Sequence, residues 1–147
     1  MDIYKKIPEF SRLNEVSLDI SNIECNCYTM DLPKSDALLG VIKFSGKYGH
    51  GSGGSDDALF IDWRINEFCD LDVPLKISAL IVDFSELEYE WGDDLFVYPE
   101  RLRSEKLPVQ IVVNEKCYEA YQGILGEKEL KTDRLEALDE IKVLLKR

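Results

Sequence analysis

The order of apolar and polar residues near the start of the chain predicts a β-hairpin. Two stretches rich in apolar and branched residues, at 23–30 (IECNCYTM) and 38–45 (LLGVIKFS), have the length of strands. Residues 31–36, which join them, include Pro33 and two aspartates, which favour a turn. Residues 1–22 show no strong period, so we expect a lead-in segment there and the α/β core over residues 23–147.

After this hairpin, the pattern predicts a glycine-rich loop and then a helix. Residues 46–55 contain five glycines, and Ser55 or Asp56 can cap the helix that follows. Apolar residues recur at helical spacing up to about residue 69, which predicts one buried helix face. The residues on that face are Ala58, Ile61, Ile65 and Phe68.

Two nearly continuous apolar runs, 77–84 (ISALIVDF) and 108–113 (PVQIVV), predict strands that are buried on both faces. We expect the first run to be the central strand of the sheet. A helix is predicted over 95–106, with Pro99 at its start or at a kink, because proline lacks the backbone N–H that a helix interior requires. Asn114 can cap a further helix.

A last helix is predicted to begin at Thr132 or Asp133. Its expected inward-facing residues are Leu135, Leu138, Ile141 and Leu145. Strands that alternate with helices after an initial hairpin predict an α/β fold. We therefore expect a single domain over 1–147, in which the N-terminal β-hairpin joins a mixed sheet of about four strands packed by helices; a chain of 147 residues supports one sizeable core.

The cysteines and the absence of export signals indicate the cellular compartment. No segment has the pattern of a targeting signal or a membrane span, so we expect a cytoplasmic protein. The four cysteines, at positions 25, 27, 69 and 117, fit neither a zinc spacing nor a disulfide framework. The alternation of Cys25 and Cys27 in a strand-like run is typical of buried free thiols in a reducing compartment.

The acidic residues are concentrated in one part of the chain. The sequence has 29 acidic and 18 basic residues, which gives a net charge of −11. Residues 48–100 hold thirteen acids and two bases, and the other 94 residues hold sixteen of each. This charge would repel nucleic acid and anionic membranes, so we expect neither as a partner. A solvated face that keeps the protein soluble and a docking face for a basic partner both remain compatible with the pattern.

Residue patterns that carry catalysis in other proteins are missing. His50, the single histidine, lies between two glycines, and no GxSxG motif is present. The glycine loop lacks the GK[ST] ending of a phosphate-binding loop, and Asp56 and Asp57 would stand where the phosphate binds. The acids at 86–94 do not follow the spacing of a calcium-binding loop. We therefore expect no catalytic residue, metal site or cofactor, and a protein that is not an enzyme.

Aromatic residues are interleaved with acids between residues 83 and 100. Such mixtures are typical of protein-binding surfaces, because the rings supply buried area and the acids steer a basic partner. In the alternative interpretation, Leu87, Trp91 and Leu95 are core residues that hold the loop. The predicted partner-binding residues are Asp56, Asp57, Glu86, Glu88, Tyr89, Glu90, Trp91, Asp93, Asp94 and Tyr98.

The segments 39–46 (LGVIKFSG) and 79–87 (ALIVDFSEL), with the order of the predicted elements, resemble the STAS (anti-anti-sigma-factor-like) family. The resemblance implies a regulatory, partner-switching protein in which a strand with a D-x-S pattern leads to a loop whose hydroxyl is phosphorylated. Asp83-Phe84-Ser85 matches that strand, but Glu90-Trp91-Gly92-Asp93 occupies the loop. No Ser or Thr lies between residues 86 and 103, so we expect no phosphoacceptor and a permanent negative charge instead.

A rival resemblance is to crotonase-like domains. Gly92-Asp93-Asp94-Leu95 is similar to the G-x-D-L pattern at a loop-to-helix junction of that family, and Pro108-Val109 to the start of the next strand. This resemblance implies an enzyme that acts on acyl-CoA. Residues 114–122 (NEKCYEAYQ), however, replace the second glycine-rich segment that would hold the oxyanion.

Three functions therefore remain open. The first is a non-catalytic acidic domain that binds a basic protein, most concretely an immunity-type inhibitor of a nuclease-like toxin. The second is a STAS-like regulator without the phosphoacceptor. The third is a degenerate crotonase-like acyl-CoA enzyme. The missing catalytic groups and the acidic segment favour the first.

Overall fold

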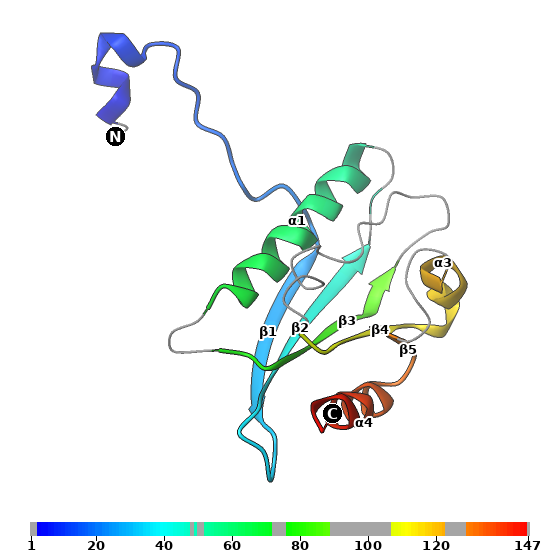
Figure 1. Cartoon of the computed structure of the whole chain (residues 1–147). Helices are drawn as coiled ribbons and strands as arrows, with labels where there is room; N and C mark the ends of the chain where they lie inside the picture. The colour runs from blue at the N-terminus through cyan, green and yellow to red at the C-terminus, as the bar shows by residue number, and fades with distance from the viewer. Residues whose placement is uncertain are drawn as a thin grey trace.

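The strands form one open sheet whose spatial order follows the order of the chain (Figure 1). This computed structural model describes residues 3–47, 49, 52–71, 76–88, 107–122 and 129–146. Within them, the strands are β1 (Glu24–Asp31), β2 (Leu38–Lys47), β3 (Ala79–Glu88), β4 (Val109–Val113) and β5 (Leu130–Lys131). The helices are α1 (Ser52–Cys69), α3 (Tyr118–Gln122) and α4 (Arg134–Leu145), and the 3-10 turns are η1 (Ile3–Lys6), η2 (Pro8–Phe10) and η3 (Glu115–Cys117).

β1 and β2 form the hairpin that the sequence predicts. They pair antiparallel, with Cys27 opposite Ile42. A hydrogen bond from Leu32 N to Ala37 O (3.1 Å) closes the turn, in which Lys34 adopts a φ of 63°. From β2 to β5, neighbouring strands are parallel. The predicted α/β domain, with a hairpin joined to a mixed sheet, is thus confirmed.

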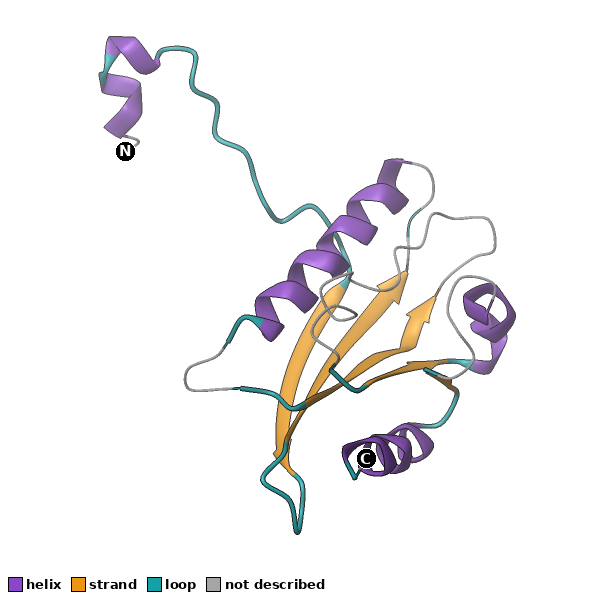
Figure 2. Ribbon diagram, in the orientation of Figure 1, coloured by secondary structure: helices purple, strands orange, loops and turns teal. Residues whose placement is uncertain are grey.

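α1 and α4 cover opposite faces of the sheet (Figure 2). Successive residues of a strand point alternately to the two faces, so each strand contributes to both cores. The α1-side core is the larger one and includes Phe44, Phe60, Ile61, Ile65, Phe68, Leu80, Val82, Phe84 and Ile111. The α4-side core comprises Leu32, Leu39, Ala79, Ile81, Val112, Ala137 and Ile141. Burial on both sides explains why β3 and β4 are nearly continuous apolar runs in the sequence.

β3 is the central strand, as the sequence predicts. It lies between β2 and β4, and its first six residues are buried. All five residues of β4 are also buried. The strand β5 was not predicted, because a run of two residues carries no hydrophobic period. The helix predicted over 95–106 lies outside the described residues.

The helix boundaries include both confirmations and corrections. α4 begins where the sequence predicts, since the Asp133 side chain accepts a hydrogen bond from Leu135 N (2.7 Å). The expected inward position of Leu135 is wrong: its side chain is 70% exposed, and the smaller Ala137 packs against the sheet instead. α1 begins at Ser52, earlier than the predicted cap at Ser55 or Asp56.

All four thiols are free, as expected. Cys117 is buried and Cys25 and Cys69 are half-buried, but Cys27 is exposed, which corrects the expectation of a buried position. The reason is the place of Cys27 on β1, an edge strand that is mostly exposed. None of the helices described is both long and apolar enough to cross a membrane.

Candidate functional site

The carboxyl ends of β2, β3 and β4 meet at one edge of the sheet, because these strands are parallel. This edge is where open α/β sheets commonly bind their ligands. Glu88 ends β3 here, and the predicted partner-binding residues from Tyr89 to Tyr98, the acidic segment, follow it in the sequence. Of the predicted partner-binding residues, Asp56, Asp57, Glu86 and Glu88 are described. The others, Tyr89, Glu90, Trp91, Asp93, Asp94 and Tyr98, lie outside the described residues, as do His50 and Gly92.

Glu86 and Glu88 differ in their surroundings although both are exposed. Glu86 Oε2 lies 3.1 Å from Lys43 Nζ and 3.0 Å from Arg134 Nη2. The hydrogen bond with Glu86 raises the pKa of Lys43, and the Glu86 charge adds to this effect. Glu88 makes no ion pair with any residue in the described part of the chain, and it lies opposite Lys47 in the register of β2 and β3. The charge of Glu86 is therefore compensated by two direct ion pairs, whereas that of Glu88 is not.

Asp83 and Arg134 fix the end of β3 against the start of α4. The side chain of Asp83 is only 4% exposed, and its Oδ2 accepts a hydrogen bond from Arg134 Nε at 2.7 Å. Asp83 Oδ1 accepts from Ser85 N (2.8 Å), and Arg134 Nη2 donates to Ser85 Oγ (2.9 Å). The hydrogen bond with Asp83 raises the pKa of Arg134. These contacts hold β3 in a defined position where the acidic segment begins.

Asn114 joins the same end of β3 to the chain that follows β4. Its Nδ2 donates weakly to Ser85 O and Leu87 O, both at 3.4 Å. Its Oδ1 accepts from Cys117 N (2.9 Å), which caps η3 as the sequence predicts. The sequence indicated this cap, but not the contacts of Asn114 with the neighbouring strand. Leu87, which the alternative interpretation placed in the core, is fully buried.

Asp56 and Asp57 also differ. Asp56 is exposed on α1, whereas Asp57 is 7% exposed. Asp57 Oδ1 accepts a hydrogen bond from Ser21 Oγ (2.6 Å), and Oδ2 accepts from Gly49 N (2.7 Å). Asp57 thus ties the lead-in segment and the glycine loop to α1. Both of its carboxylate oxygens are used inside the molecule.

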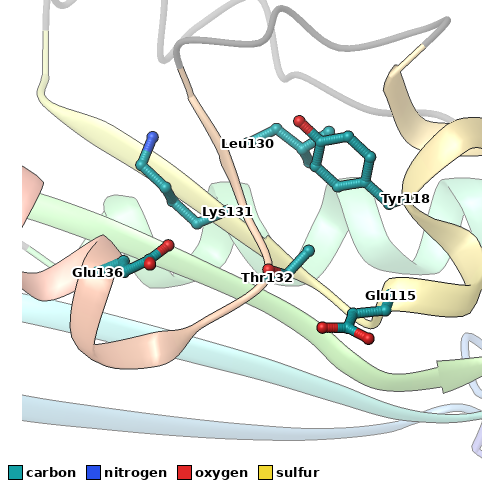
Figure 3. Close-up of a pocket in the computed structure, with 6 residues that line it drawn as sticks. All are labelled: Glu115, Tyr118, Leu130, Lys131, Thr132 and Glu136. Carbon is teal, nitrogen blue, oxygen red and sulfur yellow. The ribbon is translucent and has the colours of Figure 1, made fainter.

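A shallow pocket of about 400 Å³ lies beside this edge of the sheet (Figure 3). Its lining residues are Glu115, Tyr118, Leu130, Lys131, Thr132 and Glu136. They come from η3, α3, β5 and α4, which only the fold brings together, so no local signal in the sequence could have indicated the pocket. Two carboxylates, an ammonium and two hydroxyl groups line this pocket. None of the lining residues is among the predicted partner-binding residues.

Other titratable groups lie on the α1 side. Burial raises the pKa of Asp62, while a hydrogen bond from Asn66 Nδ2 (3.3 Å) opposes this shift. A hydrogen bond between the two thiols raises the pKa of Cys25 and lowers that of Cys27. Among the residues described, no three His, Cys, Asp or Glu side chains converge so as to hold a metal ion.

No family model, curated protein or solved structure matches the chain. The described residues show a small α/β domain with a five-strand mixed sheet and two helices packed on its faces.

Proposed function

We propose that this chain is a non-catalytic acidic domain that binds a basic protein, most concretely an immunity-type inhibitor that neutralises a nuclease-like toxin. The observation that carries the proposal is the position of the charge. The whole excess of −11 falls within residues 48–100, and the densest acids follow the carboxyl end of β3.

The contacts around this edge support a preorganised docking face. The end of β3 is held in place by contacts of Asp83, Arg134 and Asn114, so the acidic segment begins at a fixed point. A fixed starting point lowers the entropy cost of ordering the segment on binding. The active site of a nuclease is basic because it binds phosphates, and a negatively charged protein that covers it would both attract and block it.

The described contacts also rank the acids. Asp57 is committed to internal hydrogen bonds, and Glu86 is paired with Lys43 and Arg134. Asp56 and Glu88 are exposed, so they are better placed to attract a partner. We propose that they act with Glu90, Asp93 and Asp94, while the rings of Tyr89, Trp91 and Tyr98 supply buried contact area.

The test compares two variants of equal net charge. The first replaces Glu88 and Glu90 by Gln and Asp93 and Asp94 by Asn. The control makes the same changes at exposed acids outside 48–100, namely Glu9, Glu119, Asp36 and Asp139. Calorimetry and stopped-flow binding use purified basic nuclease domains, including any encoded by the adjacent reading frame.

We expect one of these nucleases to bind and to lose activity when bound. The first variant should weaken the affinity by at least about tenfold, mainly through a slower association rate, whereas the control should not. Added salt should weaken binding of the unaltered chain more than that of the first variant. Equal affinities for the two variants, or no nuclease that binds, would show that the acidic face serves only solubility.

A second candidate is a STAS-like regulator that binds its client without a phosphoacceptor. The observation that favours it is the position of Asp83-Phe84-Ser85 near the end of the central strand, in a mixed sheet that begins with a hairpin. The adjacent reading frames discriminate the two candidates. A sigma factor with a serine kinase would support the regulator, and a toxin with a basic C-terminal domain would support the inhibitor.

A further inference from the structure

The edge strand β1 has one open side. It pairs with β2, and none of the described segments lies along its other edge as a strand. Seven of its eight residues are exposed, including Tyr28 at 51% and Met30 at 45%. β1 contains neither lysine nor proline, the residues that commonly protect free edges. Such an edge is a template for an added strand.

The N-terminal arm comprises residues 3–18 and is almost entirely exposed. All its residues except Ile7 are exposed, and Figure 1 shows it projecting away from the sheet. Its exposed large apolar residues are Ile3, Tyr4, Phe10, Leu13, Val16 and Leu18. Residues 13–18 are in no helix or strand, yet Val16, Leu18 and Ile20 alternate with polar residues, which is the period of a β-strand.

The arm leaves the body of the molecule at a fixed point. Ser21 Oγ donates to Asp57 Oδ1 (2.6 Å) and accepts from Ile23 N (3.1 Å), and Ile20 packs against the α1-side core. From this anchor the arm runs away from the course of β1 (Figure 1). The arm therefore leaves its own β1 edge open.

The charges of the arm and of the receiving edge are complementary. The arm carries Lys5, Lys6 and Arg12 against Glu9 and Glu15, a net charge of +1. The receiving edge consists of β1, the adjoining C-terminal end of α1 and Asp70, which follows α1. It carries Glu24, Asp31, Glu67 and Asp70 against Arg64, a net charge of −3. The three cations lie within residues 5–12, so the attraction to the receiving edge of a second copy falls on the N-terminal part of the arm, whereas Glu15 and Asp19 accompany the strand-like residues.

The size and shape of the two parts also agree. A groove of about 200 Å³ beside β1 is lined by Cys27, Tyr28, Thr29, Glu67, Phe68 and Leu71, and it offers a place for apolar arm residues. Sixteen arm residues and the eight of β1 make twenty-four per copy. A standard protein interface uses about 20–30 residues on each side.

We propose that the arm of one copy adds as an extra strand to β1 of a second copy, so that the chain forms a dimer with reciprocally exchanged arms. Exchange of an identical element is an accessible route to a closed dimer. The added strand would satisfy the open backbone groups of β1 and bury the apolar residues of the arm. This dimer does not depend on the proposed inhibitor function.

The first test measures mass in solution by light scattering after size-exclusion chromatography. The unaltered chain should have twice the mass of one chain, which is 16.9 kDa. The double variant Val16→Asp and Leu18→Asp should be a folded monomer, because both side chains are exposed and charge would prevent their burial. The control Val143→Asp, at an exposed apolar residue of α4, should remain dimeric. A monomeric unaltered chain, or a dimer that the arm variant does not change, would overturn the proposal.

The second test uses the exposed thiol of Cys27 on the receiving strand. The variant Val16→Cys should form a covalent dimer under mild oxidation, and peptide mapping should place the bond between the introduced thiol of one copy and Cys27 of the other. The same variant with Cys27→Ser should lose this product. A bond within one chain, which leaves the mass unchanged, would mean that the arm folds back and would overturn the exchange. A covalent dimer that still forms after Cys27→Ser would show that β1 is not the strand that receives the arm.

Discussion

The two faces of the sheet are built from the same strands but differ in chemistry. On the α1 side, Leu80, Val82 and Phe84 of β3 enter a large apolar core. On the α4 side, Ala79 and Ile81 enter a smaller core. The same face then becomes polar where Asp83 meets Arg134. One face thus supplies most of the apolar burial, while the other turns polar toward the edge where the candidate site lies.

The largest expected effect concerns the two apolar cores. Phe84 is fully buried and its ring centroid lies 5.7 Å from that of Phe44. Phe84→Ala should lower the free energy of unfolding by about 3–5 kcal/mol, because it leaves a large cavity in the α1-side core. Ile141→Ala on the α4 side should lower it by about 2–3 kcal/mol, since fewer atoms are removed and the smaller core can relax. Urea unfolding measures both, and an equal loss for Ile141→Ala would contradict the stated difference between the faces.

The next effect concerns the polar part of the α4 face. Arg134→Met should lower the free energy of unfolding by about 1–3 kcal/mol, because the buried Asp83 carboxylate loses its cation. This figure is below that of a fully buried pair, since the Arg134 side chain is 58% exposed. Adding Asp83→Asn should recover most of the loss, because a neutral amide has a smaller desolvation cost.

A matched control for this pair is available on α1. Arg64 Nη1 lies 2.9 Å from Glu67 Oε1, but both side chains are exposed. Arg64→Met should therefore change the free energy of unfolding by less than about 0.5 kcal/mol. A loss for Arg64→Met as large as that for Arg134→Met would show that burial of the carboxylate is not what matters.

The smallest effect is a pH dependence on the α1 side. Burial raises the pKa of Asp62 above its usual 3.8, and none of the cations described pairs with it. At about pH 7 the carboxyl is ionised in both states, so the folded state carries the cost of the partly buried charge. Below the usual pKa both states hold the proton, and the cost disappears. Asp62→Asn should therefore raise the free energy of unfolding slightly at about pH 7 and hardly at all at about pH 3. An equal gain at both pH values in urea unfolding would contradict this assignment.

Features of the fold that rest on local signals could be predicted from the sequence. Turn residues and alternating strands indicated the hairpin, apolar runs indicated β3 and β4, and Asp133 indicated the start of α4. The face of α4 was predicted less well. The spacing favoured Leu135, whereas close packing on the sheet selects the smaller Ala137. A hydrophobic period indicates that a helix has a buried face, and packing decides which residues occupy that face.

The sequence predicted where the candidate site lies, but not which residues contact one another there. The charge count indicated the segment after β3, but Arg134 pairs with Asp83 from a distance of 51 residues along the chain. Asp57 likewise reaches back 36 residues to Ser21. Nothing in the local sequence distinguishes Asp57 from Asp56. Only the fold shows which of the two carboxylates accepts hydrogen bonds from within the molecule.

The sheet order β1-β2-β3-β4-β5 has a consequence for how the chain is made. Each strand pairs with the strand that precedes it in the sequence, so a chain emerging from the ribosome can add every new strand to an edge that already exists. None of the described strands has to wait for a partner that is synthesised later. The parallel pairs still join residues far apart along the chain, such as Leu39 with Ala79 and Leu80 with Val109, so they should form more slowly than the β1–β2 hairpin. The sequential order nevertheless shortens the time during which unpaired strand edges are exposed to other nascent chains.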